Sequence, residues 1–467
     1  MNTFFKTDCK QSINTGYVGS CGVYHGFSFM PEPEAMGLTG ETREREFRRV
    51  EAMKLKVART WFRPDYNQDM MKRFCLWLDK MKELNVKVAL QAGWWFTKDV
   101  WFFAHENYDN EEFTRDRANF ERCCDKFSIW IAKALEYFII VKEYTNIEYL
   151  VLFTEPTSYE AGPVPDGLDD LSAYEICCRK IHERLIEYGL RDRVKLMGPN
   201  GVFTSHEDKQ LAYCVEHLND VIDIYTYHTY AWLDNGWMKN PDFIMTGYDG
   251  WKKHADFIYS LEQATGKPVW IDEYGLSGQA DAFRDSSWYG NFIAQANAAF
   301  INGHLNGSFI WLLFDQKYFG DTTNNDSFYH GVHRWGTAYM PGDDVPDPEN
   351  VRPSWYMISA LSRYMSSGED TVVCASEAGE GICGAVTRPE NGEKISILLA
   401  SLGEGEVEVD VDCAGLDDRT LTVYLYDPLH IDPQKDKLLL PPAETVRAPR
   451  FTVKLPPCGA AIITDMP

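Results

Sequence analysis

Eight short apolar segments alternate with amphipathic stretches along most of the chain, and this alternation constrains the fold more than any other feature. Several of these segments are continuous, as in Ser308-Phe309-Ile310-Trp311-Leu312-Leu313-Phe314. Continuous apolar runs are typical of parallel strands that are covered on both faces. The predicted strands are 17–29, 57–62, 86–92, 147–153, 194–198, 221–227, 268–272 and 307–314. Strands that alternate with helices predict an α/β fold, the (β/α)8 TIM barrel.

The amphipathic stretches between these strands predict helices near 42–56, 68–84, 113–143, 171–190, 205–218, 247–265 and 284–305. Long loops rich in Trp, Asn, Asp, Gly and Pro follow the third, fourth, sixth and eighth predicted strands. Loops of this length in a compact domain are usually functional or disordered, and the aromatic content favours function. They lie at the carboxyl ends of barrel strands, where barrel enzymes hold their chemistry.

The pattern changes after Tyr364 to short alternating segments with turn residues between them, such as Ile395-Ser396-Ile397-Leu398-Leu399 and Val407-Glu408-Val409-Asp410-Val411. Period-two alternation predicts an antiparallel β-sandwich. We therefore expect a catalytic barrel over residues 1–366 and a C-terminal accessory domain over 367–467. The second domain could bind carbohydrate, but its few aromatic residues favour a structural companion of the barrel.

The acidic balance of the 467-residue chain, with a net charge of −24, limits its partners. Nucleic acid needs a basic surface, so it is not an expected partner. The charge also disfavours anionic membrane surfaces and acidic polysaccharides, which leaves a neutral substrate. No segment approaches the ~18 consecutive apolar residues of a membrane-spanning helix. The sequence does not indicate the oligomeric state.

Twelve cysteines are present, and two adjacent pairs of them fall on apolar helical faces, Cys123-Cys124 and Cys177-Cys178. Cysteine in such a place behaves as a small hydrophobic residue, which suits a reducing compartment. The first residues lack the long apolar run of a signal peptide, so we expect a cytoplasmic protein. Since no cysteine or histidine cluster has zinc spacing, we expect neither a metal nor a cofactor.

Two glutamates stand where predicted strands end, Glu155 after the fourth strand and Glu273 after the seventh. A carboxylate directly after a buried strand is badly placed for stability, because its charge must stay hydrated or paired. On a barrel of parallel strands the two side chains would converge on one rim. Paired carboxylates that divide the acid and nucleophile roles are typical of glycoside hydrolysis.

The pair also carries a family resemblance. Glu155-Pro156 at the fourth strand, combined with Glu273 at the seventh, resembles the clan A glycoside hydrolases, which include families 5, 30, 39 and 51. The resemblance covers about residues 15–366 and implies that Glu155 is the acid/base and Glu273 the nucleophile. The exact family stays unassigned.

Four further residues match this resemblance. Arg59 stands where the clan has an arginine on the second strand that supports the nucleophile, and His228-Thr229-Tyr230 resembles the His-x-Tyr after the sixth strand. Trp311 resembles the aromatic floor of the sugar subsite. The resemblance implies that Arg59 and Tyr230 keep the nucleophile ionised, and that His228 binds the sugar or tunes the acid/base. The plainer alternatives are a buried ion pair for Arg59, a structural histidine with satisfied hydrogen bonds for His228, a packing role for Tyr230 and a core position for Trp311.

One residue departs from the clan pattern. The clan usually has Asn before the acid/base, where it donates a hydrogen bond to the sugar 2-hydroxyl, and this chain has Thr154. A hydroxyl is shorter and lacks the two donors of an amide. Either the sugar 2-position is recognised differently, or another side chain such as Asn200 substitutes, or activity is weak.

Four tryptophans in the long loops are candidate sugar platforms, with loop packing as an equal alternative: Trp94, Trp95, Trp232 and Trp237. Two aspartates, Asp272 and Asp315, could rival the glutamates. Asp272 ranks lower, because side chains alternate along a strand and it would point away from Glu273.

These observations predict a retaining glycosidase that acts on β-linked glycosides or oligosaccharides of neutral sugars. Two other hypotheses stay open. One is a barrel that binds carbohydrate without cleaving it, and Thr154 would then mark the loss of activity. The other is a transglycosylase on the same scaffold.

Overall fold

The computed structural model describes residues 2–23, 41–64, 66–93, 96–107, 110–157, 162–202, 209–232, 247–263, 265–277, 281–314, 316–318, 331–333, 351–368, 370–390, 392, 394–433 and 437–466. The chain divides into two compact units. Unit 1 comprises Met1–Lys56, Tyr230–Tyr259 and Glu273–Pro467, and unit 2 comprises Val57–Thr229 and Ser260–Asp272. Among the described helices, none is long and apolar enough to cross a lipid bilayer.

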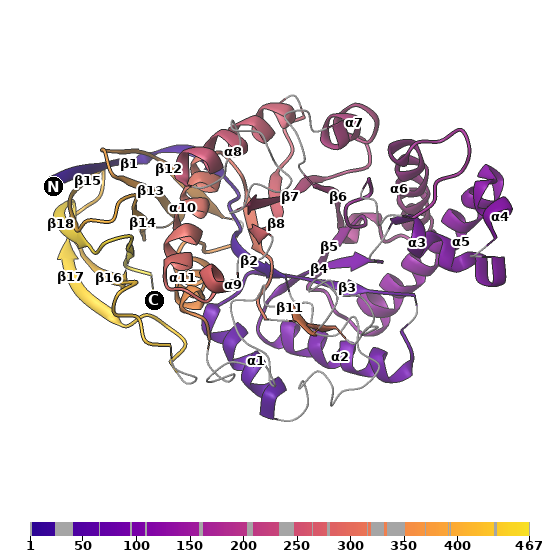
Figure 1. Cartoon of the computed structure of the whole chain (residues 1–467), viewed down its shortest axis with the longest axis horizontal. Helices are drawn as coiled ribbons and strands as arrows, with labels where there is room; N and C mark the ends of the chain where they lie inside the picture. Colours follow the sequence, from indigo (N-terminus) through magenta and orange to yellow (C-terminus); the bar gives the residue numbers. More distant parts are fainter. Residues whose placement is uncertain are drawn as a thin grey trace. The chain divides into compact units, whose positions relative to one another are not determined.

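Eight strands close into a barrel in chain order, from β2 to β9 (Figure 1). They are β2 (Gly19–Val23), β3 (Val57–Phe62), β4 (Lys87–Ala92), β5 (Ile147–Val151), β6 (Lys195–Val202), β7 (Ile224–Trp232), β8 (Val269–Ser277) and β9 (Gly307–Ile310). Neighbours run parallel in the pairs β2–β9, β3–β4, β4–β5, β5–β6 and β6–β7. Each strand overlaps a predicted one, and the predicted fold class is confirmed.

Helices occupy the segments between the barrel strands, and one more, α11, follows the last of these strands. They are α1 (Glu41–Met53), α2 (Gln68–Glu83), α3 (Phe96–Trp101), η2 (Phe102–Asn107), α4 (Glu111–Arg115), α5 (Arg117–Leu135), η3 (Glu136–Val141), α6 (Asp170–Glu187), η4 (Arg191–Arg193), α7 (Lys209–His217), α8 (Tyr248–Glu262), α9 (Asp281–Arg284), α10 (Trp288–Asn302) and α11 (Pro353–Tyr364). Two short strands, β10 (Gln316–Tyr318) and β11 (Gly331–His333), pair with each other.

The single helix predicted over 113–143 is divided in the structure. Asp116 ends α4 and begins α5, because its backbone is extended and its carboxylate accepts a hydrogen bond from the Asn119 amide. An aspartate at this position satisfies an amide that the helix itself leaves unpaired. The end of the predicted helix is η3, which is a π-helix.

Unit 1 contains a second sheet of nine strands. Its order is β17 (Pro442–Arg447), β16 (Thr420–Tyr426), β19 (Ala460–Thr464), β14 (Ser396–Ser401), β13 (Ile382–Pro389), β12 (Thr371–Ala378), β1 (Asn2–Thr15), β15 (Val407–Ala414) and β18 (Arg450–Leu455). Strands from both ends of this order, represented by Val423 of β16 and Val453 of β18, share one buried core with Ile397 and Val409. The sheet therefore folds over itself as a β-sandwich.

The N-terminal strand β1 is a member of this sheet, and no strand was predicted there. β1 runs parallel to β15 and antiparallel to β12 (Figure 1). Phe5, Thr7 and Cys9 are buried and the residues between them are exposed. This is the alternation of a strand with one buried face, but a threonine and a cysteine in two of the three buried places make it a weak hydrophobic pattern.

Helix α10 packs against this sheet within unit 1. The Asn291 side chain donates to the main-chain oxygens of Ser401 at 3.1 Å and Gly459 at 2.8 Å. The Tyr426 ring lies against Gly290, where a Cβ atom would come within 2.2 Å of the ring. These contacts fit the expected structural companion of the barrel.

All twelve cysteines are free, and ten of them are buried. The two adjacent pairs lie on the buried faces of α5 and α6, as predicted. They contribute to the helix packing as small apolar residues.

We predict that Phe5 anchors β1 in the sheet of unit 1. Phe5 is fully buried, whereas its neighbour Phe4 is 36% exposed. Phe5→Ala is expected to lower the free energy of unfolding by about 3–5 kcal/mol, because it leaves a cavity in the core. Phe4→Ala is the matched control and should lose well under half as much unfolding free energy. Urea denaturation of the two variants and the wild type measures the difference. Equal losses would contradict the anchoring role.

Candidate active site

Glu155 lies in a constrained segment of backbone that follows β5. Phe153 and Glu155 both have left-handed backbone, with φ of 66° and 46°. The Glu155 amide donates to the main-chain oxygen of Asn200 on β6 at 3.0 Å, and Asn200 is itself left-handed with φ of 55°. Residues other than glycine rarely adopt this conformation, and where they do the strain is commonly found at functional sites.

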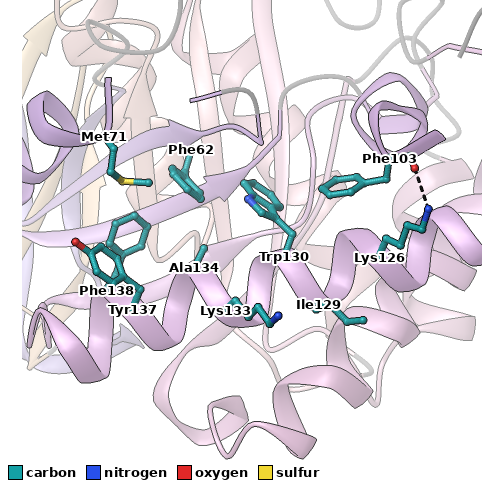
Figure 2. A pocket seen from close by; sticks show the side chains of 10 residues that line it. All are labelled: Phe62, Met71, Phe103, Lys126, Ile129, Trp130, Lys133, Ala134, Tyr137 and Phe138. Carbon is teal, nitrogen blue, oxygen red and sulfur yellow. Dashed lines mark hydrogen bonds between the residues drawn. The ribbon is translucent and has the colours of Figure 1, made fainter. Parts of the chain in front are cut away.

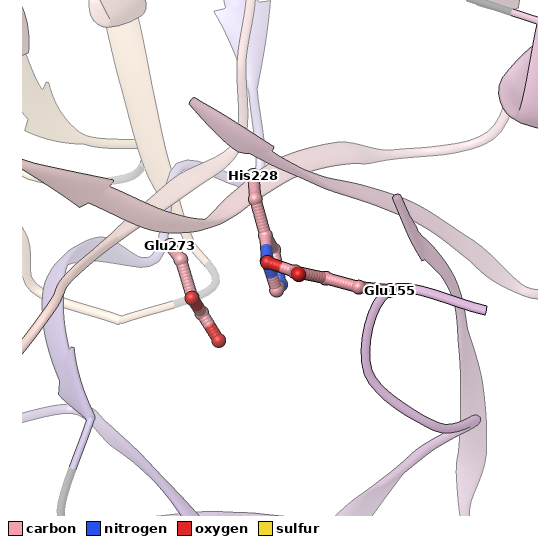
Figure 3. Close-up of side chains that lie close together, drawn as sticks. All are labelled: Glu155, His228 and Glu273. Carbon is pink, nitrogen blue, oxygen red and sulfur yellow. The ribbon is translucent and has the colours of Figure 1, made fainter. Parts of the chain in front are cut away.

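The Glu155 carboxylate meets the imidazole of His228, which comes from β7 (Figure 3). Glu155 Oε1 lies 2.9 Å from His228 Nδ1, and the Glu155 side chain is 22% exposed while the histidine is fully buried. Burial, with the charge of Arg59 as a second cause, holds the pKa of His228 well below its usual range. The ring is therefore neutral at neutral pH, and the two nitrogens have opposite roles.

Arg59 on β3 is fully buried and satisfies its donors inside unit 2. It donates to Gln91 Oε1 at 3.0 Å through Nε and at 2.5 Å through Nη2, and to the main-chain oxygen of Asp272 at 2.9 Å. Nη2 also reaches Thr154 Oγ1 at 3.3 Å. Gln91 Nε2 donates to the same threonine hydroxyl. Thr154 is therefore held by Arg59 and Gln91 in the interior.

Asp272 on β8 is fully buried beside two basic groups. Its Oδ2 lies 3.5 Å from Arg59 Nη1, and its Oδ1 lies 3.5 Å from His228 Nε2. Burial raises the pKa of Asp272 to about 6, although the charge of Arg59 opposes this shift. Asp272 thus changes charge close to neutral pH.

Glu273 follows Asp272 in sequence and belongs to unit 1. Its Oε2 accepts a hydrogen bond of 2.6 Å from the Tyr230 hydroxyl. Glu273 is 3% exposed and Tyr230 is 8% exposed. A hydroxyl that donates to a carboxylate favours its ionised form.

The other predicted residues of the described chain are buried. Trp311, directly after β9, is 8% exposed, and its main-chain amide donates to the main-chain oxygen of Tyr274 at 2.9 Å. Asn200 is fully buried, and its Oδ1 accepts from the Thr226 hydroxyl at 2.5 Å. The main-chain oxygen of Asn200 accepts from the Glu155 amide. The role of the Asn200 side chain in sugar recognition stays a prediction.

Three of the loop tryptophans, Trp94, Trp95 and Trp237, lie outside the described residues, as does Asp315. Trp232 ends β7, but its side chain is also outside the description. Their predicted role as sugar platforms stays a prediction.

Gln91 and Asp272 are the residues whose role sequence reasoning missed or ranked too low. Gln91 interrupts an apolar run, Val88-Ala89-Leu90-Gln91-Ala92, close to the end of β4. A polar side chain in a strand that is otherwise buried needs a partner, and this was the available signal. Asp272 was considered only as a rival catalytic carboxylate.

A hollow in unit 2 lies apart from these residues and has different chemistry (Figure 2). It has a volume of about 450 Å³, and its lining includes Phe62, Phe103, Trp130, Lys126 and Lys133. The rings of Phe62 and Trp130 are stacked with their centres 5.0 Å apart. No residue that lines it carries a carboxylate, so this hollow has no group suited to glycoside hydrolysis.

Comparison with known proteins places the fold. No family model and no curated protein matches the sequence. Among solved structures, the family 30 subfamily 8 xylanase of Clostridium acetobutylicum has a TM-score of 0.62 at 11% identity, with 99% of each chain covered. A family 39 β-xylosidase from Caulobacter crescentus has a TM-score of 0.57 at 13% identity, with 100% of each chain covered.

A glucosidase from Croceicoccus marinus has a TM-score of 0.61 at 11% identity, with 99% of each chain covered. In fold, the chain is similar to glycoside hydrolases of clan A. These are the families that the strand-end glutamates resemble, and the likeness extends over both the barrel and the β-sandwich. At such identities the likeness concerns the fold alone.

We predict that Asp272 makes stability depend on pH between its unfolded pKa of about 4 and its folded pKa of about 6. The folded chain binds the proton more tightly, so the carboxyl contributes stability below the unfolded pKa. That contribution is lost as pH rises through the folded pKa. Relative to the wild type, Asp272→Asn should therefore gain about 1–3 kcal/mol in unfolding free energy from pH 4 to pH 7.

Urea denaturation at several pH values measures this difference. Asp223→Asn is the matched control, since Asp223 also pairs with an arginine, at 2.9 Å, but its side chain is 34% exposed. The control is expected to follow the pH dependence of the wild type. A constant difference between wild type and Asp272→Asn would contradict the prediction.

Proposed function

We propose that the protein is a retaining glycoside hydrolase in which Glu155 is the acid/base and Glu273 the nucleophile. The observation that carries this proposal is the contrast between their partners. Glu155 meets a neutral imidazole and is partly exposed, whereas Glu273 is buried and accepts from a tyrosine hydroxyl. Two carboxyl groups in contrasting environments are what double displacement requires.

Each step of the reaction uses one of these environments. Protonated Glu155 donates its proton to the departing glycosidic oxygen while Glu273 attacks the anomeric carbon and forms a glycosyl-enzyme. Glu155, now ionised, takes a proton from water, and that water hydrolyses the intermediate. Glu155 follows β5 and Glu273 lies within β8, and groups toward the carboxyl ends of parallel barrel strands face one rim, which supports a joint role for the two glutamates.

The proposed substrate is a β-linked glycoside or oligosaccharide of neutral sugars. The net charge of −24 opposes acidic polysaccharides. The xylanase, xylosidase and glucosidase names of the structural neighbours are consistent with neutral sugars. The twelve free thiols support a cytoplasmic location. Substrates there would be small glycosides or imported oligosaccharides, which the enzyme would cleave from one end of the sugar chain.

Two other functions are candidates, and one observation bears on the first of them. Thr154 is held by Arg59 and Gln91, which fits a barrel that binds sugar but does not cleave it. Calorimetry that detects an oligosaccharide, together with no release of product, would favour this binding function. A transglycosylase would be recognised by elongated products at high acceptor concentration.

We predict opposite substrate dependence for the two glutamate variants. Glu273→Gln should abolish turnover of every substrate, because no nucleophile remains. Glu155→Ala should lose oligosaccharides but keep aryl glycosides with good leaving groups, which need no acid. Azide should then restore the rate of Glu155→Ala. Kinetics on a panel of nitrophenyl glycosides and β-linked oligosaccharides measure both.

Glu148→Gln is the matched control, because Glu148 lies on β5 and pairs with Lys87 at 2.8 Å outside the candidate site. It should leave activity unchanged. Mild and equal losses in the Glu155 and Glu273 variants would refute the assignment.

We predict that the Tyr230 hydroxyl supports the nucleophile. Tyr230→Phe should lower kcat about 10- to 100-fold, because a hydrogen bond to a charged group contributes about 1.5–3 kcal/mol. Tyr225→Phe is the control on the same strand, since its hydroxyl donates to Asn219 at 2.9 Å. Equal rates for wild type and Tyr230→Phe would remove the tyrosine from the mechanism.

A further inference from the structure

Three neighbouring side chains of unit 2, Glu155, His228 and Asp272, lead from the partly exposed carboxyl of Glu155 into the buried interior. Glu155 Oε1 lies 2.9 Å from His228 Nδ1, and His228 Nε2 lies 3.5 Å from Asp272 Oδ1. His228 and Asp272 are both fully buried. The second distance is longer than a hydrogen bond, but such contacts often tighten when substrate binds.

We propose that Asp272 acts through His228 to hold a proton on Glu155, so that the charge of a buried carboxyl sets the pH range in which the acid is loaded. This inference rests on the proposed acid/base role of Glu155. Asp272 and His228 are positioning residues here, because neither is proposed to touch the substrate.

The coupling follows from the chemistry of a neutral imidazole, in which one nitrogen donates and the other accepts. When Asp272 is ionised, it attracts the ring proton to Nε2, and Nδ1 presents a lone pair. Only a protonated Glu155 can then donate to Nδ1. When Asp272 is protonated, it donates to Nε2, the ring proton lies on Nδ1, and Nδ1 donates to Glu155.

The change between these states balances with one proton from solvent. Glu155 takes up the solvent proton as its own proton passes to Nδ1, and the Nε2 proton passes to Asp272 Oδ1. The O–H bond of Glu155 and the N–H bond of Nε2 break, new bonds form at Nδ1 and Asp272 Oδ1, and the solvent proton forms a new O–H bond at Glu155. The ring stays neutral throughout.

The surrounding charges permit this coupling. Arg59 Nη1 lies 3.5 Å from both His228 Nε2 and Asp272 Oδ2, so it can donate to Nε2 when the ring proton is on Nδ1 and to ionised Asp272 when the ring proton is on Nε2. Its charge and the burial of the ring keep His228 below its usual pKa, so the neutral tautomers exist at mildly acid pH. Burial raises the pKa of Asp272 to about 6, so its charge changes within the working range of a hydrolase.

The test reads the tautomer of His228 directly, by nitrogen NMR of protein labelled at histidine. Among the 11 histidines, the His228 signals are identified by their loss in His228→Gln. We expect the proton on Nε2 at about pH 7 and on Nδ1 at about pH 5. In Asp272→Asn the amide donates to Nε2, and the proton should stay on Nδ1 at both. The same tautomer at both pH values in the wild type would overturn the proposal, even if the variant fails to fold.

The rate measurement gives a second readout. In Asp272→Asn the alkaline limb of kcat/KM should move about 1–2 pH units lower for glycosides with poor leaving groups, which need the acid. For good leaving groups the limb should stay in place. A purely structural role of Asp272 would lower both rates without moving either limb, and that result would also overturn the proposal.

The two proposals can fail separately. If the wild type cleaves no glycoside, the hydrolase proposal fails while the tautomer measurement still decides the coupling. If the wild type is active and Glu155→Ala behaves as an acid/base variant, an unmoved limb in Asp272→Asn removes the coupling alone. Asp223→Asn is the control, because its carboxylate also pairs with an arginine but adjoins the start of β7.

Discussion

The buried charge of the Arg59 guanidinium is the constraint on which the rest of the described site depends. Arg59 is fully buried on β3, and the guanidinium of an arginine is a permanent cation in proteins. A buried charge costs several kcal/mol unless its donors are satisfied. Gln91 and the main chain of Asp272 accept from it, and the Asp272 carboxylate lies within 3.5 Å. Gln91 on β4, Asp272 on β8 and Thr154 after β5 are thereby committed to Arg59.

The same charge determines how His228 can act on Glu155. A second cation beside the buried Arg59 is unfavourable, so the imidazole of His228 stays neutral. It therefore interacts with Glu155 through a hydrogen bond and not through an ion pair. A protonated histidine would stabilise the ionised carboxylate and work against an acid. The proposed nucleophile Glu273 must instead be ionised, and the hydrogen bond from the Tyr230 hydroxyl stabilises that form. The proposed division of roles thus follows from the partners of each carboxyl.

The sequence predicted the barrel strands and the sandwich because each rests on a local pattern. Local patterns also singled out Glu155, His228 and Tyr230, whose role in a site stays a prediction. Strand β1 was missed, since Thr7 and Cys9 dilute its apolar face. The division at Asp116 was missed because a helical pattern continues across it. The contacts of Arg59 depend on which side chains meet across strands, and spacing along one chain carries no such information. Gln91 became interpretable only through its partner.

Thr154 gains a physical explanation from this arrangement. Thr154 is 5% exposed and its hydroxyl is bound by Arg59 and Gln91, so it completes the support of the buried charge. The amide that clan A enzymes offer to the sugar 2-hydroxyl is then missing at this position. A site that hydrogen-bonds a hydroxyl rejects analogues without it strongly, whereas apolar contacts discriminate weakly. Hydrolysis by this chain would therefore depend less on the sugar 2-hydroxyl than the clan pattern implies.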